Sequence, residues 1–123
     1  MILVDTSVWV NHLRFADERL TALLHEKEVL GHPFVIGEVA LGHLRQREAT
    51  LRSLQRLPQA AVATHREVLR LIQAHPLHGR GIGYVDAHLL AATRLTIGAS
   101  LWTADRRLET VAAELGVAAM LSH

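Results

Sequence analysis

The amino-acid sequence predicts an α/β fold in which helices cover both faces of a mostly parallel sheet. Short apolar segments of strand length alternate with longer segments in which apolar residues recur at helical spacing. Parallel strands need a crossover connection, usually a helix, so this alternation favours parallel pairing. Half of the 123 residues are hydrophobic, which is enough for the core of one compact domain over residues 1–123.

The N-terminal half contains two predicted strands and several predicted helices. Asp5, Thr6 and Ser7 supply side chains that cap a helix start, and Pro33 suits the first turn of another helix. A proline also ends the last helix of this half, at position 58. In chain order, the expected elements are a strand at 2–4, a capped helix start at 5–7, a helix at 17–27, a short strand at 29–30, a helix from 33 to about 45 and a helix at 47–57.

The C-terminal half continues the alternation of strands and helices. Thr64 and Glu67 match a capping box at a helix start, and Gly98 is a natural stop for a later helix. In chain order, the expected elements are a strand at 60–63, a helix at 65–74, a glycine-rich loop at 75–83, a helix carrying Asp86 and ending near 98, a strand at 100–102, a helix at 105–115 and a strand at 117–121.

Acidic residues follow apolar segments in an unusual way. The chain has four aspartates, and three of them end short apolar runs: ILVD at Asp5, GYVD at Asp86 and LWTAD at Asp105. In parallel sheets, ligands bind beyond the carboxyl ends of the strands, so we expect these three acids at one edge. Glu38 lies in the apolar segment PFVIGEVALGHL, and we expect it on a buried, apolar helix face.

Carboxylates that converge need a compensating positive charge. At an effective dielectric of about 20, two carboxylates ~4 Å apart repel by roughly 4 kcal/mol, whereas a whole domain is stable by only about 5–15 kcal/mol. Oxygen-only ligands suit Mg²⁺ or Mn²⁺, and such an ion can activate water for phosphodiester cleavage. Two other roles stay open: the aspartates also cap predicted helices, and Glu38 could pair with an arginine elsewhere in the chain.

Composition excludes several other classes of protein. The chain has no cysteine, so disulfides, thiolate nucleophiles and cysteine-ligated metals are excluded, and no H-E-x-x-H zinc motif occurs. No apolar run has the ~18 residues that a membrane span needs, and a cytoplasmic setting fits. The net charge is only +1, although Lys27 is the single lysine and arginine, which suits phosphate contacts, supplies the other basic residues.

Four motifs in a fixed order resemble the PIN-domain ribonucleases, and among them the VapC toxins of bacterial toxin–antitoxin pairs. The motifs are VDTSVW (4–9), the isolated Glu38, GYVDAHLLA (83–91) and LWTADRRL (101–108), and together they extend over nearly the whole chain. The resemblance implies a three-layer α/β/α sandwich with a central, mostly parallel sheet. It also implies an Mg²⁺- or Mn²⁺-dependent endoribonuclease that cleaves tRNA or ribosomal RNA.

The resemblance also implies roles for individual residues. Asp5, Asp86 and Asp105 would be metal ligands, with Asp105 the more distant, and Glu38 would position or deprotonate the attacking water. The supporting residues would be Thr103, which orients acids or water, Thr6 or Ser7, which do the same beside Asp5, and Arg106 and Arg107, which contact phosphate.

Two protein partners follow from the same resemblance. VapC toxins form homodimers and bind a VapB antitoxin, whose C-terminal segment covers the pocket and often inserts an arginine among the acids. We expect the antitoxin to occupy an apolar groove, and the candidate lining residues are Val8, Trp9, Leu13, Leu23 and Leu24.

Two alternative functions use the same acids differently. A phosphotransfer domain also carries acids at a sheet edge, but a receiver needs a lysine after a late strand, and an aspartyl-phosphate phosphatase needs an aspartate where this chain has Ser7. A non-catalytic PIN-like module for protein binding tends to lose one or more acids, and all four are present here.

Overall fold

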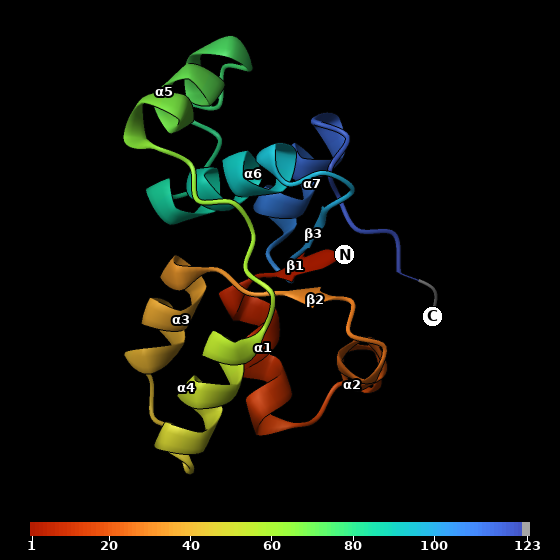
Figure 1. Ribbon diagram of the computed structural model, residues 1–123. Helices are drawn as coiled ribbons and strands as arrows, with labels where there is room; N and C mark the ends of the chain where they lie inside the picture. Colours follow the sequence, from red (N-terminus) through yellow and green to blue (C-terminus); the bar gives the residue numbers. More distant parts are fainter. Residues whose placement is uncertain (122–123) are drawn as a thin grey trace.

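The computed structural model describes residues 1–121, and in them a sheet of three parallel strands lies between two groups of helices (Figure 1). The strands are β1 (Ile2–Val4), β2 (Val29–Leu30) and β3 (Ser100–Trp102). Their order in the sheet is β2-β1-β3, and Ile2 pairs with Val29 on one side and Ser100 on the other. The predicted α/β fold with a parallel sheet is confirmed.

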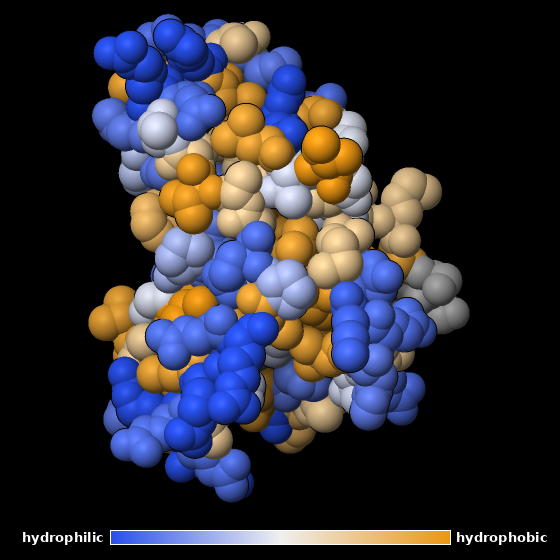
Figure 2. Space-filling model, in the orientation of Figure 1, coloured by the Kyte–Doolittle hydropathy of each residue, from blue (hydrophilic) through white to orange (hydrophobic). Residues whose placement is uncertain are grey.

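Helices cover both faces of this sheet. They are α1 (Thr6–Arg14), α2 (Glu18–His25), α3 (Pro33–Ala40), α4 (Arg47–Arg56), α5 (His65–Ala74), α6 (Tyr84–Leu95) and α7 (Arg106–Glu114). In Figure 1, α6 and α7 lie on one side of the strands, whereas α1, α3 and α4 lie on the other. The outward face of α4 is hydrophilic (Figure 2). No helix within residues 1–121 is both long and apolar enough to cross a membrane.

The core lies where the sheet meets these helices. Leu3 and Val4 of β1 are fully buried, and Leu101 of β3 is nearly so. This is the pattern of parallel strands covered on both faces, which carry continuous apolar runs rather than alternating ones. From α6, Leu89 and Leu90 are fully buried as well. The core therefore holds the central strands in place. The backbone of the residues that directly follow β1 and β3 is anchored by these strands.

Two predicted strands are wrong. Residues 60–63 form no strand: the amide of Ala60 donates to the carbonyl of Gly31, beside β2, but the next amide, of Ala61, donates to the Thr96 hydroxyl instead. A single bridge between Gly31 and Gln59 is what remains there. Residues 117–121 form no strand either, since they contact β3 through one bridge, from Leu101 to Ala118. Each segment extends the sheet by a bridge rather than by a full strand.

Several helices end earlier than predicted. Helix α3 ends at Ala40 instead of about residue 45, and the guanidinium of Arg47 donates to the carbonyl of Ala40. Helix α2 ends at His25 instead of residue 27, because Lys27 adopts a left-handed conformation that stops a helix. The capping box at the start of α5 is confirmed, with Thr64 as the cap.

Candidate active site

The four predicted acids lie at or near one edge of the sheet, beyond the carboxyl ends of the strands. Asp5 follows β1 directly, and Asp105 lies three residues after β3. Glu38 comes from α3, which follows β2, and Asp86 lies in the first turn of α6. The four acids therefore come from segments that meet at this edge of the sheet. We call these four residues together the acid pocket.

Asp5 is the most enclosed of the four acids, with an exposed fraction of 5%. One carboxylate oxygen, Oδ1, accepts a hydrogen bond from the backbone amide of Thr6 at 2.7 Å. The other, Oδ2, accepts from the Ser7 hydroxyl at 2.8 Å and from the Thr103 hydroxyl at 2.7 Å. A buried carboxylate needs such partners, and here every one of them is a neutral donor.

Two hydroxyl groups connect Asp5 to the loop that follows β3. The Ser7 oxygen accepts from the amide of Ala104 at 3.0 Å, and the Thr103 oxygen accepts from the amide of Asp105 at 3.0 Å. Because each hydroxyl already accepts a backbone proton, its own proton is directed at Asp5. These hydrogen bonds agree with the predicted orienting roles of Ser7 and Thr103. They also connect the Asp5 carboxylate to the backbone of the loop that carries Asp105.

Glu38 is exposed, so the prediction that it lies buried on an apolar face is wrong. The neighbouring Val35 and Val39 occupy the core side of α3 and are 1% and 2% exposed. Glu38 lies on another side of the helix, where its Oε1 accepts from the Thr6 hydroxyl at 2.6 Å. Thr6 thus links Glu38 to Asp5 across the pocket, because its amide binds one acid and its hydroxyl the other.

Asp86 shows the electrostatic effect of the cluster. Its Oδ2 accepts from the backbone amide of Gly83 at 2.9 Å, which closes the first turn of α6. Burial raises the pKa of Asp86, and the negative charges of Asp5, Asp105 and Glu38 raise it further, against the opposing effect of the Gly83 hydrogen bond. Burial is thus the largest cause of the raised pKa of Asp86, and repulsion by the other three acids adds to it.

Asp105 is exposed and caps α7. Its Oδ1 accepts from the amides of Arg107 at 2.9 Å and Leu108 at 3.2 Å. Asp5 caps α1 in the same way, and Asp86 belongs to a capping box with Gly83. The capping alternative is therefore confirmed for the three aspartates, and it does not compete with the cluster, because capping and clustering use the same edge of the sheet.

None of the four acids has a basic partner among residues 1–121. The ion pairs in this part of the chain use other acids: Glu28 with the N-terminus, Asp17 with Arg19, and Glu114 with Arg80. The suggested pairing of Glu38 with an arginine is therefore wrong. Negative charge accumulates in the pocket without a protein cation to neutralise it.

The two arginines next to Asp105 differ in their surroundings. Arg106 is exposed at the start of α7. Arg107 instead lies against the glycine-rich loop, where its Nη1 would be 2.7 Å from a Cβ at Gly81, a residue with φ of +80°. A side chain at position 81 would therefore both strain the backbone and displace Arg107. Arg107 packs on the loop that leads into α6.

The chemistry of the donors fits a hard divalent cation. Carboxylate and hydroxyl oxygens line the pocket, and these are the ligands that Mg²⁺ and Mn²⁺ prefer. Within residues 1–121, no three acidic or histidine side chains converge closely enough to form a complete ligand set on their own. Mg²⁺ usually keeps several waters and binds one or two carboxylates, so a closed cage is not required.

One feature beside the pocket was not predicted from the sequence. Histidine and aromatic rings from α3, α5 and α6 and the residue before α3 contact one another in edge-to-face or tilted geometry. We call them the aromatic cluster: His32, Phe34, His65, Tyr84 and His88. His32 is fully buried, and burial, with a smaller effect of His88, lowers its pKa to about 4. The only sequence signal is helical spacing, since Phe34 precedes Glu38 by four residues and Tyr84 precedes His88 by four.

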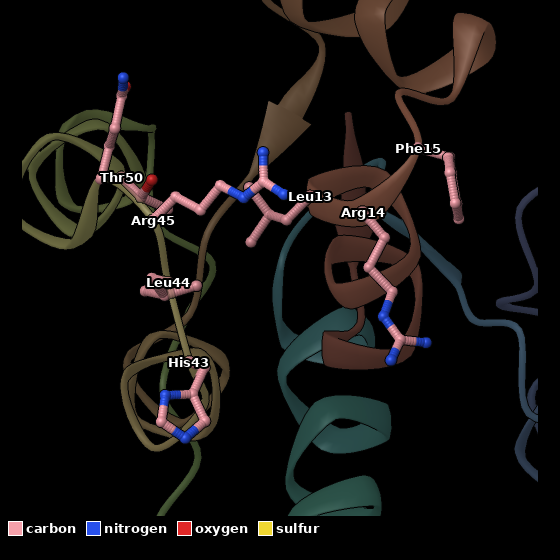
Figure 3. A pocket seen from close by; sticks show the side chains of 8 residues that line it. Leu13, Arg14, Phe15, His43, Leu44, Arg45 and Thr50 are labelled. Atoms are coloured by element: carbon pink, nitrogen blue, oxygen red, sulfur yellow. The ribbon is translucent and has the colours of Figure 1, made fainter.

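A groove lies at the opposite end of α1 and follows α1 toward α2 and α4. It joins two cavities of about 770 and 280 Å³ that share Leu13, Gln46 and Thr50. Figure 3 shows the first cavity, with the Arg45 side chain pointing toward Leu13. We call this feature the α1–α4 groove. Its other lining residues are Trp9, His12, Arg14, Phe15, Leu24, His43, Leu44, Ala49, Ser53, Leu54 and Leu57.

Three of the five residues predicted to line an apolar groove do so, namely Trp9, Leu13 and Leu24. Val8 instead belongs to the core, with 4% exposure, and Leu23 is partly buried against the core. The basic residues of the groove were not predicted. Arg14 lies at the end of α1, and His43 and Arg45 come from the connection between α3 and α4, where a longer α3 was predicted.

Comparisons with known proteins agree with the geometry. The family model of the PIN domain matches residues 2–114. Two curated proteins, both named Ribonuclease VapC32 and from two strains of Mycobacterium tuberculosis, are each 55% identical to this chain over 118 residues. The matched region is 96% of this chain and 95% of each relative. The similarity therefore includes the strands, the acid pocket and the α1–α4 groove.

Proposed function

Because the chain belongs to the PIN domain family, we propose that it is a metal-dependent endoribonuclease that uses Mg²⁺ or Mn²⁺ to cleave RNA, with tRNA or ribosomal RNA as the substrate. The observation that carries this proposal is the acid pocket, where four carboxylates approach one another and no described basic side chain neutralises them. The name of the Mycobacterium tuberculosis relatives, Ribonuclease VapC32, supports the same reaction class.

The burial and the hydrogen-bond partners of each acid indicate its role in the reaction. Asp5 and Asp86 hold the cation, with Asp105 beside them. When bound, the cation neutralises the carboxylates and stabilises the charge that develops on the scissile phosphate. Glu38 is exposed and keeps one carboxylate oxygen clear of Thr6, so it positions the attacking water and accepts its proton.

The surrounding polar residues keep the acids in place. Ser7 and Thr103 donate to Asp5 and prevent its carboxylate from rotating. Arg106 is exposed next to the pocket and contacts the RNA phosphate, which suits a guanidinium. Arg107 lies against the glycine-rich loop before Asp86 and is exposed, so it contacts the RNA phosphate from that position. No side-chain nucleophile is needed for this reaction.

Cleavage of a structured RNA in Mg²⁺, in Mn²⁺ and in excess EDTA tests the proposal. We expect cleavage with either metal and none with EDTA. Asp17→Asn is a matched control, because Asp17 caps α2 as Asp5 caps α1 but lies outside the acid pocket. Equal cleavage with and without EDTA would contradict the metal mechanism. No cleavage under any condition would favour the alternative of a protein-binding PIN-like module.

We further propose that the enzyme is a toxin neutralised by a VapB-type antitoxin that binds the α1–α4 groove. The groove has apolar side chains along its length and Arg14 and Arg45 among its lining residues. An amphipathic helix with acidic residues beside its apolar face would match both features. An antitoxin arginine that reaches the acid pocket would replace the charge of the cation. Co-expression of such a protein should abolish cleavage, and a purified complex should lack activity.

We propose that the enzyme forms a homodimer through exposed apolar residues near α5 and α6. Val62, Leu95 and Ile97 are 52%, 46% and 100% exposed. They lie near one another, because the amide of Ala61 donates to the hydroxyl of Thr96 at 2.9 Å. Light scattering after gel filtration should give twice the mass of the chain, and Ile97→Asp should shift the population toward monomer. A monomeric wild-type protein at micromolar concentration would contradict this part of the proposal.

A further inference from the structure

Exposed aromatic rings in this protein concentrate beside the acid pocket. The chain has five phenylalanine, tyrosine and tryptophan residues, of which Trp9 and Trp102 are buried. Of the remaining three, Phe15 lies at the far end of α1, and Phe34 and Tyr84 both belong to the helices that carry pocket acids. Phe34 is 36% exposed and Tyr84 is 45% exposed. Two of the three exposed rings therefore belong to helices that carry acids of the pocket.

Helical spacing places the Phe34 ring next to Glu38, and ring contacts connect Tyr84 to Phe34. Phe34 lies one turn before Glu38 on α3, so the two side chains project from the same side of that helix. Tyr84 is the first residue of α6, two positions before Asp86, so its ring leaves α6 on a different side from the Asp86 carboxylate. His88 joins the two helices, because its ring is 4.6 Å from both the Phe34 ring and the Tyr84 ring. The rings therefore form a continuous surface across the starts of α3 and α6.

Hydrogen bonds hold the Tyr84 ring in position. Its hydroxyl oxygen is 2.6 Å from Nδ1 of His65 and 2.9 Å from Nε2 of His88. Nδ1 of His88 is buried and has no partner among residues 1–121. A buried N–H without an acceptor is costly, so the proton of His88 belongs on Nε2, which donates to Tyr84, and Tyr84 then donates to His65. The Tyr84 hydroxyl thus accepts one hydrogen bond and donates another, and the two bonds fix the orientation of the Tyr84 ring.

We propose that Phe34 and Tyr84 form a stacking platform for an unpaired base of the RNA, next to the scissile phosphate. This inference rests on the proposed ribonuclease activity and names the two residues that contact a base of the substrate. Packing explains why His32 and His88 are buried, but it does not explain two rings that remain exposed at the edge of a phosphate-cleaving pocket. Bases in a duplex have covered faces, whereas an unstacked base presents a face that an aromatic ring can bind.

The small net charge of the chain strengthens this argument. With a net charge of +1, phosphate contacts alone provide little affinity for RNA. Stacking of a base on an aromatic side chain supplies affinity without added charge, and loss of one such contact weakens binding by about 5- to 150-fold. The exposed His65, whose Nδ1 accepts from the Tyr84 hydroxyl, offers its other ring nitrogen to the same base.

Fluorescence of 2-aminopurine tests the platform without relying on cleavage. Single-stranded oligoribonucleotides that carry 2-aminopurine at each position in turn are titrated with the Asp5→Asn protein in Mg²⁺, which leaves the RNA intact. We expect quenching at one position. Phe34→Leu and Tyr84→Leu, each combined with Asp5→Asn, should abolish that quenching and raise Kd about tenfold or more. Tyr84→Phe keeps the ring and should change Kd by less than about threefold.

Phe15→Leu is the matched control, since Phe15 is 86% exposed but lies at the other end of α1. It should retain both the quenching and the affinity. Thermal unfolding shows that each variant is folded, and if Phe34→Leu is unfolded, the Tyr84→Leu and Tyr84→Phe pair decides the question. Quenching that persists in Tyr84→Leu overturns the proposal, as does a loss of affinity that is equal in Phe15→Leu. Metal-dependent cleavage by the wild-type enzyme is measured separately, so a failure of the platform is distinguishable from a failure of the ribonuclease.

Discussion

The two ends of α1 have opposite chemistry. The helix begins at Thr6, directly after Asp5 of the acid pocket, whose four acids have no basic partner among residues 1–121. It ends at Arg14, beside a groove of apolar and basic side chains with Phe15 almost fully exposed. Nine helical residues, about 13 Å, separate the two regions.

The difference indicates which partner each region suits. Carboxylates with fixed hydroxyl donors are a site for a small, hard cation, because the charges are concentrated and the geometry is rigid. A long groove that mixes leucines with arginines suits a protein segment, because its affinity comes from area and from charges at the rim. Substitutions at the two ends are far enough apart to act independently, so each region can be broken while the other remains intact.

The largest effect is expected from Asp5→Asn. It keeps the shape and the helix cap but removes a charge from the cation site, and the stabilisation that a catalytic metal provides corresponds to roughly a thousandfold in rate. Cleavage should fall by that order, whereas binding of an antitoxin at the α1–α4 groove should persist. An Asp5→Asn enzyme that cleaves RNA at the wild-type rate would contradict the proposal that this end of α1 holds a catalytic cation.

Leu13→Arg should have the opposite effect to Asp5→Asn: it should weaken antitoxin binding and leave RNA cleavage unchanged. Leu13 lines both cavities of the groove, and a larger cationic side chain there blocks an apolar partner while suiting the C-terminal end of a helix. Affinity for an antitoxin peptide should fall about 30-fold or more, as for the loss of a central interface contact. RNA cleavage should be unchanged. A parallel loss of cleavage would show that the two regions are coupled.

Thr103→Val tests the support of Asp5. Valine has a similar shape but cannot donate to Asp5 or accept from the amide of Asp105. Loss of a residue that orients a metal ligand typically lowers metal affinity or activity about 10- to 100-fold. We expect a reduction in this range, partly restored by raising the Mn²⁺ concentration. Thr110→Val, at an exposed hydroxyl of α7, is the control and should have wild-type activity.

Asp105→Asn should have a smaller effect on cleavage, below about tenfold, because Asp105 is exposed and one of its oxygens is engaged in the cap of α7. Asparagine caps a helix nearly as well as aspartate, so thermal stability should hardly change. A loss of activity as large as that of Asp5→Asn would assign Asp105 a direct role equal to that of Asp5.

The smallest expected effect is on the pH dependence of the free energy of unfolding, and it concerns Asp86 alone. The pKa of Asp86 is raised in the folded protein, so its contribution to the metal-free stability is full at low pH and is lost as pH rises through the folded-state pKa. Asp86→Asn should remove this loss and leave EDTA-treated protein more stable than the wild type above that pH. Urea unfolding at a series of pH values measures the difference. A destabilised Asp86→Asn protein at pH 7 would contradict repulsion in the pocket.

The sequence predicted the parts of the site that depend on strand ends. Asp5, Asp86 and Asp105 each follow a short apolar run, and such runs mark either a strand or a helix start at the functional edge of a parallel sheet. Glu38 was placed at the right site but on the wrong side of its helix, because its neighbours are apolar all round and periodicity could not distinguish the core side from the pocket side.

Features that depend on tertiary contacts could not be predicted from local sequence patterns. Residues 117–121 have strand-like composition, but they contact only one edge residue of β3, so a single bridge forms. Helix α3 ends at Ala40, whose carbonyl accepts from the guanidinium of Arg47, a contact that periodicity does not reveal. The ring contacts between Phe34 and His88 join helices that are distant in the sequence, and no local pattern specifies them.

Binding of Mn²⁺ to the isolated protein tests the central claim most directly. The six-line electron paramagnetic resonance signal of free Mn²⁺ disappears on binding, which allows the bound fraction to be titrated without RNA. We predict a saturable site in the wild-type protein, strong weakening in Asp5→Asn and Asp86→Asn, and unchanged binding in Asp17→Asn, whose carboxylate is paired with Arg19 outside the pocket. Equal Mn²⁺ binding by the wild type and Asp86→Asn, or none by the wild type, would contradict the account.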